Sequence, residues 1–84
     1  MIKKIILFGA GIAGQLALHY YGSDNVFCFC DNQKYGQHLY GKDVISFDDL
    51  KTIHNNYQVV ITVNQVIAST LKKQCQGHGI PFVS

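Results

Sequence analysis

The sequence has 84 residues and a mass of 9.4 kDa, which suffices for one small domain and is too little for two. Hydrophobic residues make up 48% of the chain and charged residues 14%, a balance that excludes a charge-rich disordered segment and favours a buried core. The net charge of +2 comes from seven Lys and five Asp, with no Arg or Glu, and excludes the strongly basic face that nucleic-acid binding usually needs.

The lack of a recognisable targeting signal and the number of cysteines indicate the compartment. The apolar run at residues 5–13 is too short to cross a bilayer, and the basic start leads into glycines, not into a signal-peptide core. Three cysteines suit neither a disulfide scaffold nor a paired zinc site. We therefore expect a soluble, cytoplasmic chain without membrane insertion. Cys28 and Cys30 should be buried on one face of a strand, and Cys75 should lie at a helix surface or flank.

Strands and helices alternate along the chain. Short apolar or β-branched runs predict strands at residues 2–8, 26–30, 43–45, 58–63 and 80–83, with a polar loop at 33–42. Helices are predicted from the glycines after the first strand to Gly22, from Ser46 to about His54, and along a stripe that stops at Gly77; the members of that stripe are Val66, Ile67, Thr70, Leu71 and Gln74. This alternation predicts one α/β domain over residues 1–84, with three layers around a parallel sheet of four to five strands.

The stretch GAGIAG at residues 9–14 matches the pattern G-x-G-x-x-G. It directly follows a predicted strand and opens a predicted helix, the context in which this pattern binds nucleotide phosphates. Its glycines permit a tight turn, the approach of a phosphate and close helix packing, and the first helical turn presents free N–H groups to an anion. A tight turn without a ligand is the alternative. The predicted phosphate site consists of Gly9, Ala10, Gly11, Ile12, Ala13 and Gly14.

Polar residues follow the next strands at the same edge of the predicted sheet. Asp31 lies 22 residues beyond Gly9, close to the spacing expected for an acid that binds a ribose hydroxyl, and an acid there disfavours a 2′-phosphate. Asn32 follows it, and Lys34 in the same loop could reach a phosphate. Asn64 follows the strand at 58–63 and could read a base or sugar. The alternatives are turn capping by Asp31, a solvated Lys34 and helix capping by Asn64.

No motif in the sequence predicts catalysis or metal binding. The four histidines share no ligand spacing, and no hydroxyl or thiol has a visible partner pair of histidine and carboxylate. We therefore predict no catalytic residue and no metal site, and whether the chain belongs to an enzyme stays open.

The features of the chain occur in a recognisable order. After G-x-G-x-x-G come a strand ending in Asp (FCFCDN), the loop QKYGQHLYGKDVIS, an acidic helix start (FDDL), and a strand and helix running from ITVNQ to GHGIPFVS. Nearly the whole chain thus resembles the Rossmann-like, nucleotide-sugar-binding amino-terminal domain of bacterial sugar N- and O-acyltransferases, and similar domains of glycosyltransferases and other polysaccharide-biosynthesis enzymes. The NAD-binding domain of the redox-sensing repressor Rex and the CoA-binding domain of succinyl-CoA synthetase share this layout.

The resemblance implies a ligand, a partner and site residues. It places Gly9, Gly11 and Gly14 beside a diphosphate, Asp31 and Asn32 near the nucleoside and Lys34 at the border of the site. The implied ligand is a nucleoside diphosphate sugar such as a UDP-sugar, held for a catalytic domain in the same or another chain. In the acyltransferases the chemistry belongs to a separate β-helix domain with hexapeptide repeats, and this sequence has no such repeats.

Two other interpretations remain open. The same glycines could hold the pyrophosphate of NAD, with Asp31 on its ribose, in an oxidoreductase or redox sensor, although 84 residues leave no room for the second half-fold of a hydride-transfer enzyme. A domain that has kept the fold and lost the ligand is the third interpretation. A homo-oligomer is compatible with a small parallel sheet, but no residue in the sequence argues for one.

Overall fold

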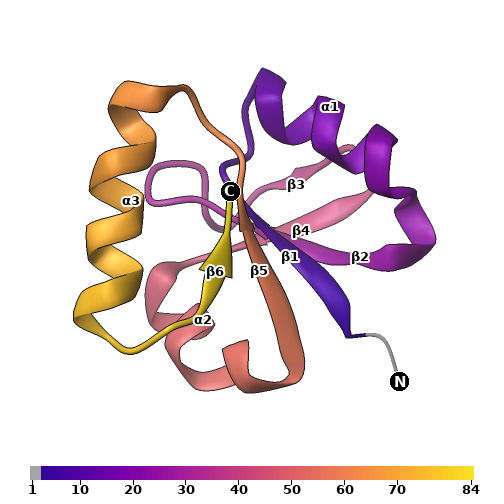
Figure 1. Cartoon of the computed structure of the whole chain (residues 1–84). Helices are drawn as coiled ribbons and strands as arrows, with labels where there is room; N and C mark the ends of the chain where they lie inside the picture. The colour runs from indigo at the N-terminus through magenta and orange to yellow at the C-terminus, as the bar shows by residue number, and fades with distance from the viewer. Residues whose placement is uncertain (1–2) are drawn as a thin grey trace.

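The computed structural model describes residues 3–84, which form a mixed six-stranded sheet and three α-helices (Figure 1). The strand order is β3-β4-β2-β1-β5-β6, and every neighbouring pair is parallel except β3 and β4. The strands are β1 (Lys4–Phe8), β2 (Val26–Cys30), β3 (His38–Leu39), β4 (Lys42–Ile45), β5 (Tyr57–Ile61) and β6 (Phe82–Val83), and the helices are α1 (Ile12–Tyr21), α2 (Phe47–Ile53) and α3 (Gln65–Gly77).

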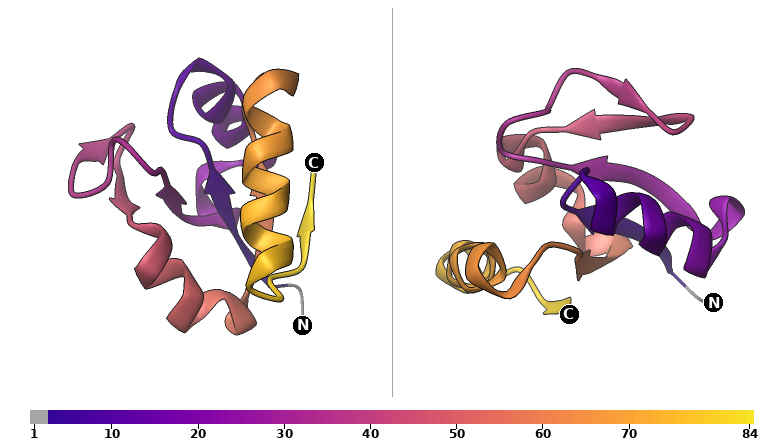
Figure 2. Two further views of the ribbon diagram at one scale, coloured as in Figure 1. Left: turned by 90° about the vertical axis from the view of Figure 1, so that its left-hand side faces the viewer. Right: turned by 90° about the horizontal axis from the view of Figure 1, so that it is seen from above.

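Helices cover both faces of the sheet, as Figure 2 shows from two further directions. On one face, Leu7 of β1 and Phe29 of β2 pack with Leu18 of α1. On the other face, a larger cluster joins the sheet to α2 and α3, with Leu50 and Leu71 at its helical side. The predicted α/β architecture with helices on both faces is therefore confirmed.

The edge of the sheet differs from the prediction. The sequence predicts four or five parallel strands and a loop at residues 33–42, but β3 lies inside that loop and pairs antiparallel with β4. Tyr40 and Gly41 connect the two strands with φ angles of +54° and +78°, the left-handed conformation that suits a two-residue hairpin turn. The sheet is therefore mixed and has six strands. The predicted start of the first strand at Ile2 lies outside the described residues.

Local capping groups set the ends of the helices close to their predicted positions. The helix α1 ends at Tyr21 and is capped by Gly22, which has a φ of +90° and donates its N–H to the carbonyl of Leu18. The Ser46 side chain accepts a hydrogen bond from the backbone N–H of Asp49 at the start of α2, as the capping-box pattern predicts.

All three cysteines are buried free thiols. The predicted burial of Cys28 and Cys30 is confirmed, but the prediction of a surface position for Cys75 is wrong. Cys75 lies in the apolar cluster between α3 and the sheet and is fully buried. Leu71 and Cys75 are four residues apart, so they lie on the same side of the helix and both face the sheet. The predicted stripe contained Leu71 but not Cys75.

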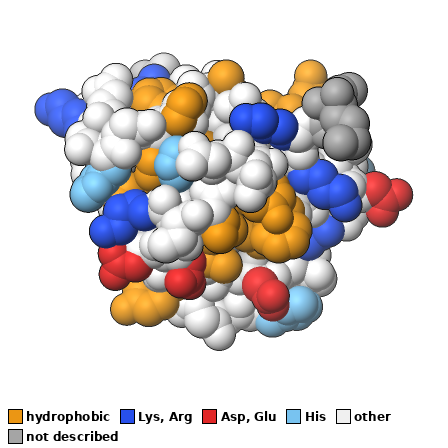
Figure 3. Space-filling view, turned by 90° about the horizontal axis from the view of Figure 1, so that it is seen from below, with side chains coloured by type: hydrophobic (Ala, Val, Ile, Leu, Met, Phe, Trp, Pro, Cys, Tyr) orange, Lys and Arg blue, Asp and Glu red, His pale blue; other side chains and the backbone are white. Residues whose placement is uncertain are grey.

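Charge and hydropathy are distributed without a dominant patch on the face shown in Figure 3. Both lysine and aspartate side chains are present there, and hydrophobic side chains reach the surface among the polar ones. Such interspersed charge gives no single-sign field on this face. None of the helices within residues 3–84 combines the length and the hydropathy that a membrane crossing requires.

Candidate functional site

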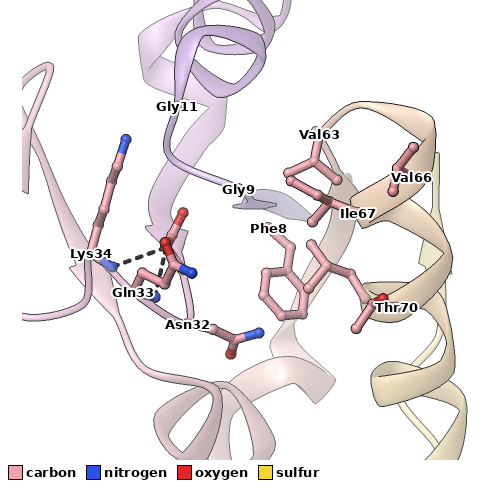
Figure 4. Close-up of a pocket in the computed structure, with 12 residues that line it drawn as sticks. Phe8, Gly9, Gly11, Asn32, Gln33, Lys34, Val63, Val66, Ile67 and Thr70 are labelled. Carbon is pink, nitrogen blue, oxygen red and sulfur yellow. Dashed lines mark hydrogen bonds between the residues drawn. The ribbon is translucent and has the colours of Figure 1, made fainter.

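The candidate site is a cleft at the carboxyl ends of the central strands β1, β2 and β5. The loops that follow these strands are fastened together: the Gly9 N–H donates to the carbonyl of Cys30 over 2.8 Å, and the Thr62 hydroxyl donates to the carbonyl of Gly9 over 3.0 Å. A hollow of about 450 Å³ opens between these loops and α3 (Figure 4). Its lining consists of Phe8, Gly9, Gly11, Asp31, Asn32, Gln33, Lys34, Val63, Val66, Ile67, Thr70 and Leu71.

Two of the three motif glycines are required by the fold itself. Gly9 has a φ of +123°, and a Cβ there would lie 2.6 Å from the carbonyl oxygen of Thr62. A Cβ at Gly14 would collide with the Gly9 carbonyl and press on the Phe29 ring, because α1 crosses the sheet at this point. Both positions therefore exclude any side chain, whether or not a ligand binds.

Gly11 differs from the other two glycines. Its φ of −87° lies on the negative side that L-residues adopt, so no left-handed conformation requires glycine here. A Cβ at Gly11 would meet only the Lys34 ammonium nitrogen, at 3.8 Å. Neither packing nor backbone conformation requires glycine at this position, which lines the cleft. The absence of a side chain leaves the backbone open to close approach from the cleft.

The first turn of α1 begins at this open backbone. The helix has neither a side-chain cap nor an acidic residue in its first turn, whereas Ser46 caps α2 and Asn64 caps α3. The first helical hydrogen bond runs from the Gln15 N–H to the Gly11 carbonyl, so the preceding N–H groups of the helix have no acceptor within it. These N–H groups and the positive end of the helix dipole favour an anion.

The Asp31 carboxylate holds the glycine turn and its own loop in place. Its Oδ2 accepts a hydrogen bond from the Ala10 N–H at 3.0 Å, and its Oδ1 accepts from the N–H groups of Gln33 and Lys34 at 2.8 and 2.9 Å. Partial burial acts to raise the pKa of Asp31, but these three hydrogen bonds and the charge of Lys34 outweigh it and hold the pKa below its usual value. Asp31 is thus ionised at neutral pH, with one acceptor position free on Oδ2.

Lys34 supplies the positive charge of the cleft. Its side chain is half-buried and extends beside the glycine turn toward the start of α1 (Figure 4). The ammonium lies near Gly11, while the backbone N–H of Lys34 donates to Asp31. The cleft therefore combines a lysine, an open backbone and a helix N-terminus on one side, and all three attract an anion.

The opposite wall of the cleft is apolar and comes from α3. Val66 and Ile67 expose 84% and 48% of their surface, and Thr70 lies beside them. Asn32 and Gln74 exchange two side-chain hydrogen bonds, of 2.9 and 3.3 Å, which tie the loop after β2 to α3. The cleft is thus polar toward α1 and apolar toward α3.

The structure brings together half of the ten residues predicted for the site. Gly9, Gly11, Asp31, Asn32 and Lys34 line the cleft. The remaining five lie outside its lining: Ala10 is buried behind Asp31, Ile12 and Ala13 are exposed on α1, Gly14 packs on the sheet, and Asn64 accepts a hydrogen bond from the Ile67 N–H as the cap of α3.

The sequence reasoning missed the apolar wall as part of the site. Its signal was present, since the stripe used to predict α3 contains Val66, Ile67, Thr70 and Leu71, which line the cleft, and Gln74, which bonds Asn32. The stripe therefore marks the side of α3 that faces the cleft.

Comparison with protein-family models gave no match, and comparison with curated proteins gave no significant match. Among residues 3–84, no group of three or more His, Cys, Asp or Glu side chains is arranged to hold a metal ion. The chemical character of the cleft therefore rests on its own geometry.

Proposed function

We propose that this chain is a Rossmann-like nucleotide-binding module. Its five parallel strands follow the order β4-β2-β1-β5-β6, which supports this assignment because it matches the 3-2-1-4-5 order of doubly wound nucleotide-binding sheets. In such sheets the ligand lies outside the carboxyl ends of the strands, where the chain switches sides, and the cleft lies at this position. The antiparallel strand β3 is an addition at one edge.

The observation that carries the proposal is Gly11. Gly9 and Gly14 are needed for the turn and for packing, but Gly11 has open space on its cleft side. In dinucleotide-binding turns, the second glycine lets the backbone approach the pyrophosphate closely. A diphosphate here would accept hydrogen bonds from the first turn of α1 and an ion pair from Lys34, which suits a chain that contains no arginine.

The apolar wall on α3 suits the nucleoside part of the ligand. A cleft of about 450 Å³ falls within the range of roughly 300–1,000 Å³ typical of small-molecule sites. A flat base can pack against Val66 and Ile67 while its diphosphate lies against the first turn of α1. The resemblance to nucleotide-sugar-binding domains favours a nucleoside diphosphate sugar, presented to a catalytic domain that modifies or transfers sugars in surface polysaccharide biosynthesis.

NAD is the second candidate ligand, and one observation favours it. Asp31 keeps one free acceptor position on Oδ2, enough for one ribose hydroxyl, at the end of the second parallel strand. Under either candidate, the role proposed for this chain is ligand binding, and no residue is assigned a catalytic role. None of the histidines among the described residues lines the cleft.

A thermal-shift panel tests the proposal. The purified chain is melted at neutral pH with UDP, UDP-N-acetylglucosamine, a CDP-sugar, NAD or CoA, each at millimolar concentration. A ligand present at 100 times its dissociation constant stabilises the folded state by about 2.7 kcal/mol. A shift with the pyrimidine nucleotides alone supports the sugar-nucleotide module, and a shift with NAD alone supports the second candidate. A flat panel that stays flat in a titration contradicts both.

A further inference from the structure

The helix α1 carries an apolar stripe on its outer side. Ile12, Leu16 and Tyr20 follow each other at intervals of four residues and expose 78%, 66% and 83% of their surface. None of the three lines the nucleotide cleft. Residues spaced by four lie on one side of a helix, so the three side chains form a continuous apolar ridge.

Packing of the opposite side of α1 fixes the outward direction of this ridge. Gly14 and Leu18 are buried against the sheet, and a side chain at Gly14 would collide with the Gly9 carbonyl. A step of two residues turns a helix by about 200°. Leu16 and Tyr20 must therefore point away from the sheet once Gly14 and Leu18 face it.

A hollow lies beside the ridge. It measures about 450 Å³ and runs between α1 and the turn of the β3–β4 hairpin, lined by Gln15, Leu16, Leu18, His19 and Tyr40. Tyr40 exposes 44% of its surface and touches Phe29 edge-on, with ring centroids 5.9 Å apart. The outer side of α1 thus presents protruding apolar side chains. The recess next to them has apolar walls from Leu16, Leu18 and Tyr40 and a polar part from Gln15 and His19.

We propose that this surface pairs with the same surface of a second copy of the chain. The two α1 helices would cross antiparallel about a two-fold axis near Leu16, with Tyr20 of each copy beside the recess and the Ile12 of the other. The inference does not depend on the proposed nucleotide site.

The charge of α1 favours a second copy over a charged partner. The segment Ile12–Tyr21 contains no Lys, Arg, Asp or Glu, so two copies can pair without like-charge repulsion. An isologous interface must be self-complementary, and an uncharged ridge beside a recess meets this requirement. Apart from His19 in its last turn, the helix offers a strongly acidic or basic partner no complementary side chain.

The available area indicates a weak dimer. Tyr20 offers on the order of 150 Å², and Ile12 and Leu16 on the order of 100 Å² each. With the walls of the recess, each copy contributes roughly 500 Å², which totals about 1,000 Å², the lower limit for a specific interface. We therefore expect a dissociation constant above about 10 µM.

Sedimentation velocity over a concentration series from about 5 µM to 1 mM tests the pairing, without nucleotide. The expected result is a shift from a 9.4 kDa species toward twice that mass as the concentration rises. Leu16→Lys and Tyr20→Lys should each weaken dimerisation at least tenfold, because Leu16→Lys sets two ammonium groups at the axis and Tyr20→Lys removes the protruding ring. Tyr35→Lys, at an aromatic residue that is 57% exposed on another surface, is the matched control and should leave dimerisation unchanged.

Disulfide trapping gives a second measurement. In Leu16→Cys, the two new thiols would lie near the axis, so mild oxidation with diamide should yield a covalent dimer. Tyr35→Cys should stay monomeric under the same conditions, and the three native cysteines are buried. A sample that is monomeric throughout the series overturns the proposal. So does a dimer that survives both lysine substitutions, or equal trapping of the two cysteine variants.

Discussion

The carboxylate of Asp31 accepts a hydrogen bond from the backbone N–H of Ala10 at 3.0 Å, which ties the end of β2 to the glycine turn after β1. The two residues are 21 positions apart in the sequence, and only Asp31 lines the cleft. Asp31 also accepts hydrogen bonds from Gln33 and Lys34, so one carboxylate organises both loops that line the polar side of the cleft.

This relationship predicts the effect of replacing Asp31. Asp31→Asn removes the charge that strengthens three hydrogen bonds and should lower the free energy of unfolding at pH 7 by about 1–3 kcal/mol. Urea unfolding measures the loss. Asp24→Asn removes a charge without removing such contacts and should change stability by less than about 0.5 kcal/mol. Equal effects of the two substitutions would show that the change in net charge, and not the loss of the Asp31 hydrogen bonds, lowers the stability.

The hydrogen bonds to the Asp31 carboxylate also predict how the free energy of unfolding depends on pH. Because the pKa of Asp31 is lower in the folded than in the unfolded chain, its stabilising contribution is complete above its ordinary pKa of 3.8. The contribution is lost as the pH falls below 3.8 through the folded-state value. Stability measured between pH 5 and 2 should therefore fall less steeply in Asp31→Asn than in the unchanged chain. An equally steep fall in stability in the two chains would contradict this role of Asp31.

The sequence predicted the elements whose signals are local. The glycine turn, Ser46 before α2 and the apolar strands each depend on a few neighbouring residues, and their positions agree with the structure to within a few residues. The hairpin of β3 and β4 was missed because a two-residue strand has no periodicity to detect, and its signal lies in the turn at Tyr40 and Gly41.

The spacing of apolar residues in the sequence did not show which side of each helix faces the sheet. The pattern in α1 predicted a helix, but Leu16 and Tyr20 point outward because Gly14 must face the sheet. The same limit applies to α3, where Cys75 turned out to be buried and the predicted stripe lines the cleft. The three hydrogen bonds that Asp31 accepts from backbone N–H groups could not be predicted either, because they depend on how two loops meet.

The three motif glycines should respond differently to substitution. Gly14→Ala forces a Cβ into the Gly9 carbonyl and should lower the free energy of unfolding by about 3 kcal/mol, a large share of the stability of a small domain. Gly11→Val should lower the free energy of unfolding by only about 1 kcal/mol, because valine is a poorer N-cap of α1 than glycine but its side chain enters the cleft and not the core. The thermal shift with a nucleotide should disappear in Gly11→Val. Retention of the full shift would show that the ligand does not lie against the turn.

Lys34 should contribute to binding and not to folding. Lys34→Gln removes the one ammonium group that lies beside Gly11 and should weaken nucleotide binding about five- to tenfold at low salt, with little change in the unliganded melting temperature. Isothermal titration at two salt concentrations measures this, and the difference between the variant and the unchanged chain should shrink at high salt. Lys73→Gln, at an exposed lysine of α3 outside the cleft lining, is the control and should bind normally. A Lys34→Gln variant that binds like the control would remove Lys34 from the site.

The cysteines should be unreactive until the chain unfolds. Burial raises the pKa of Cys28 to about 12 and that of Cys75 to about 11, and Cys30 is shifted upward as well, mainly by burial. Thiolates are the reactive form, so a disulfide reagent at pH 8 should label the native chain only at the rate of transient opening. All three thiols should react at once in denaturant. Rapid labelling of one thiol in the native chain would contradict its buried position.

Substitutions of Asn64 can test whether its side chain caps α3 or binds the ligand. Its Oδ1 accepts a hydrogen bond from the Ile67 N–H at 3.1 Å and caps α3. Asn64→Ala should therefore lower the free energy of unfolding by about 1 kcal/mol, while Asn64→Ser, which keeps a capping oxygen, should lose much less. If Asn64 acts only as a cap, the increase in melting temperature on adding nucleotide should be the same in Asn64→Ser as in the unchanged chain. A serine variant that folds normally but loses this increase would assign the amide to the ligand, as the sequence first suggested.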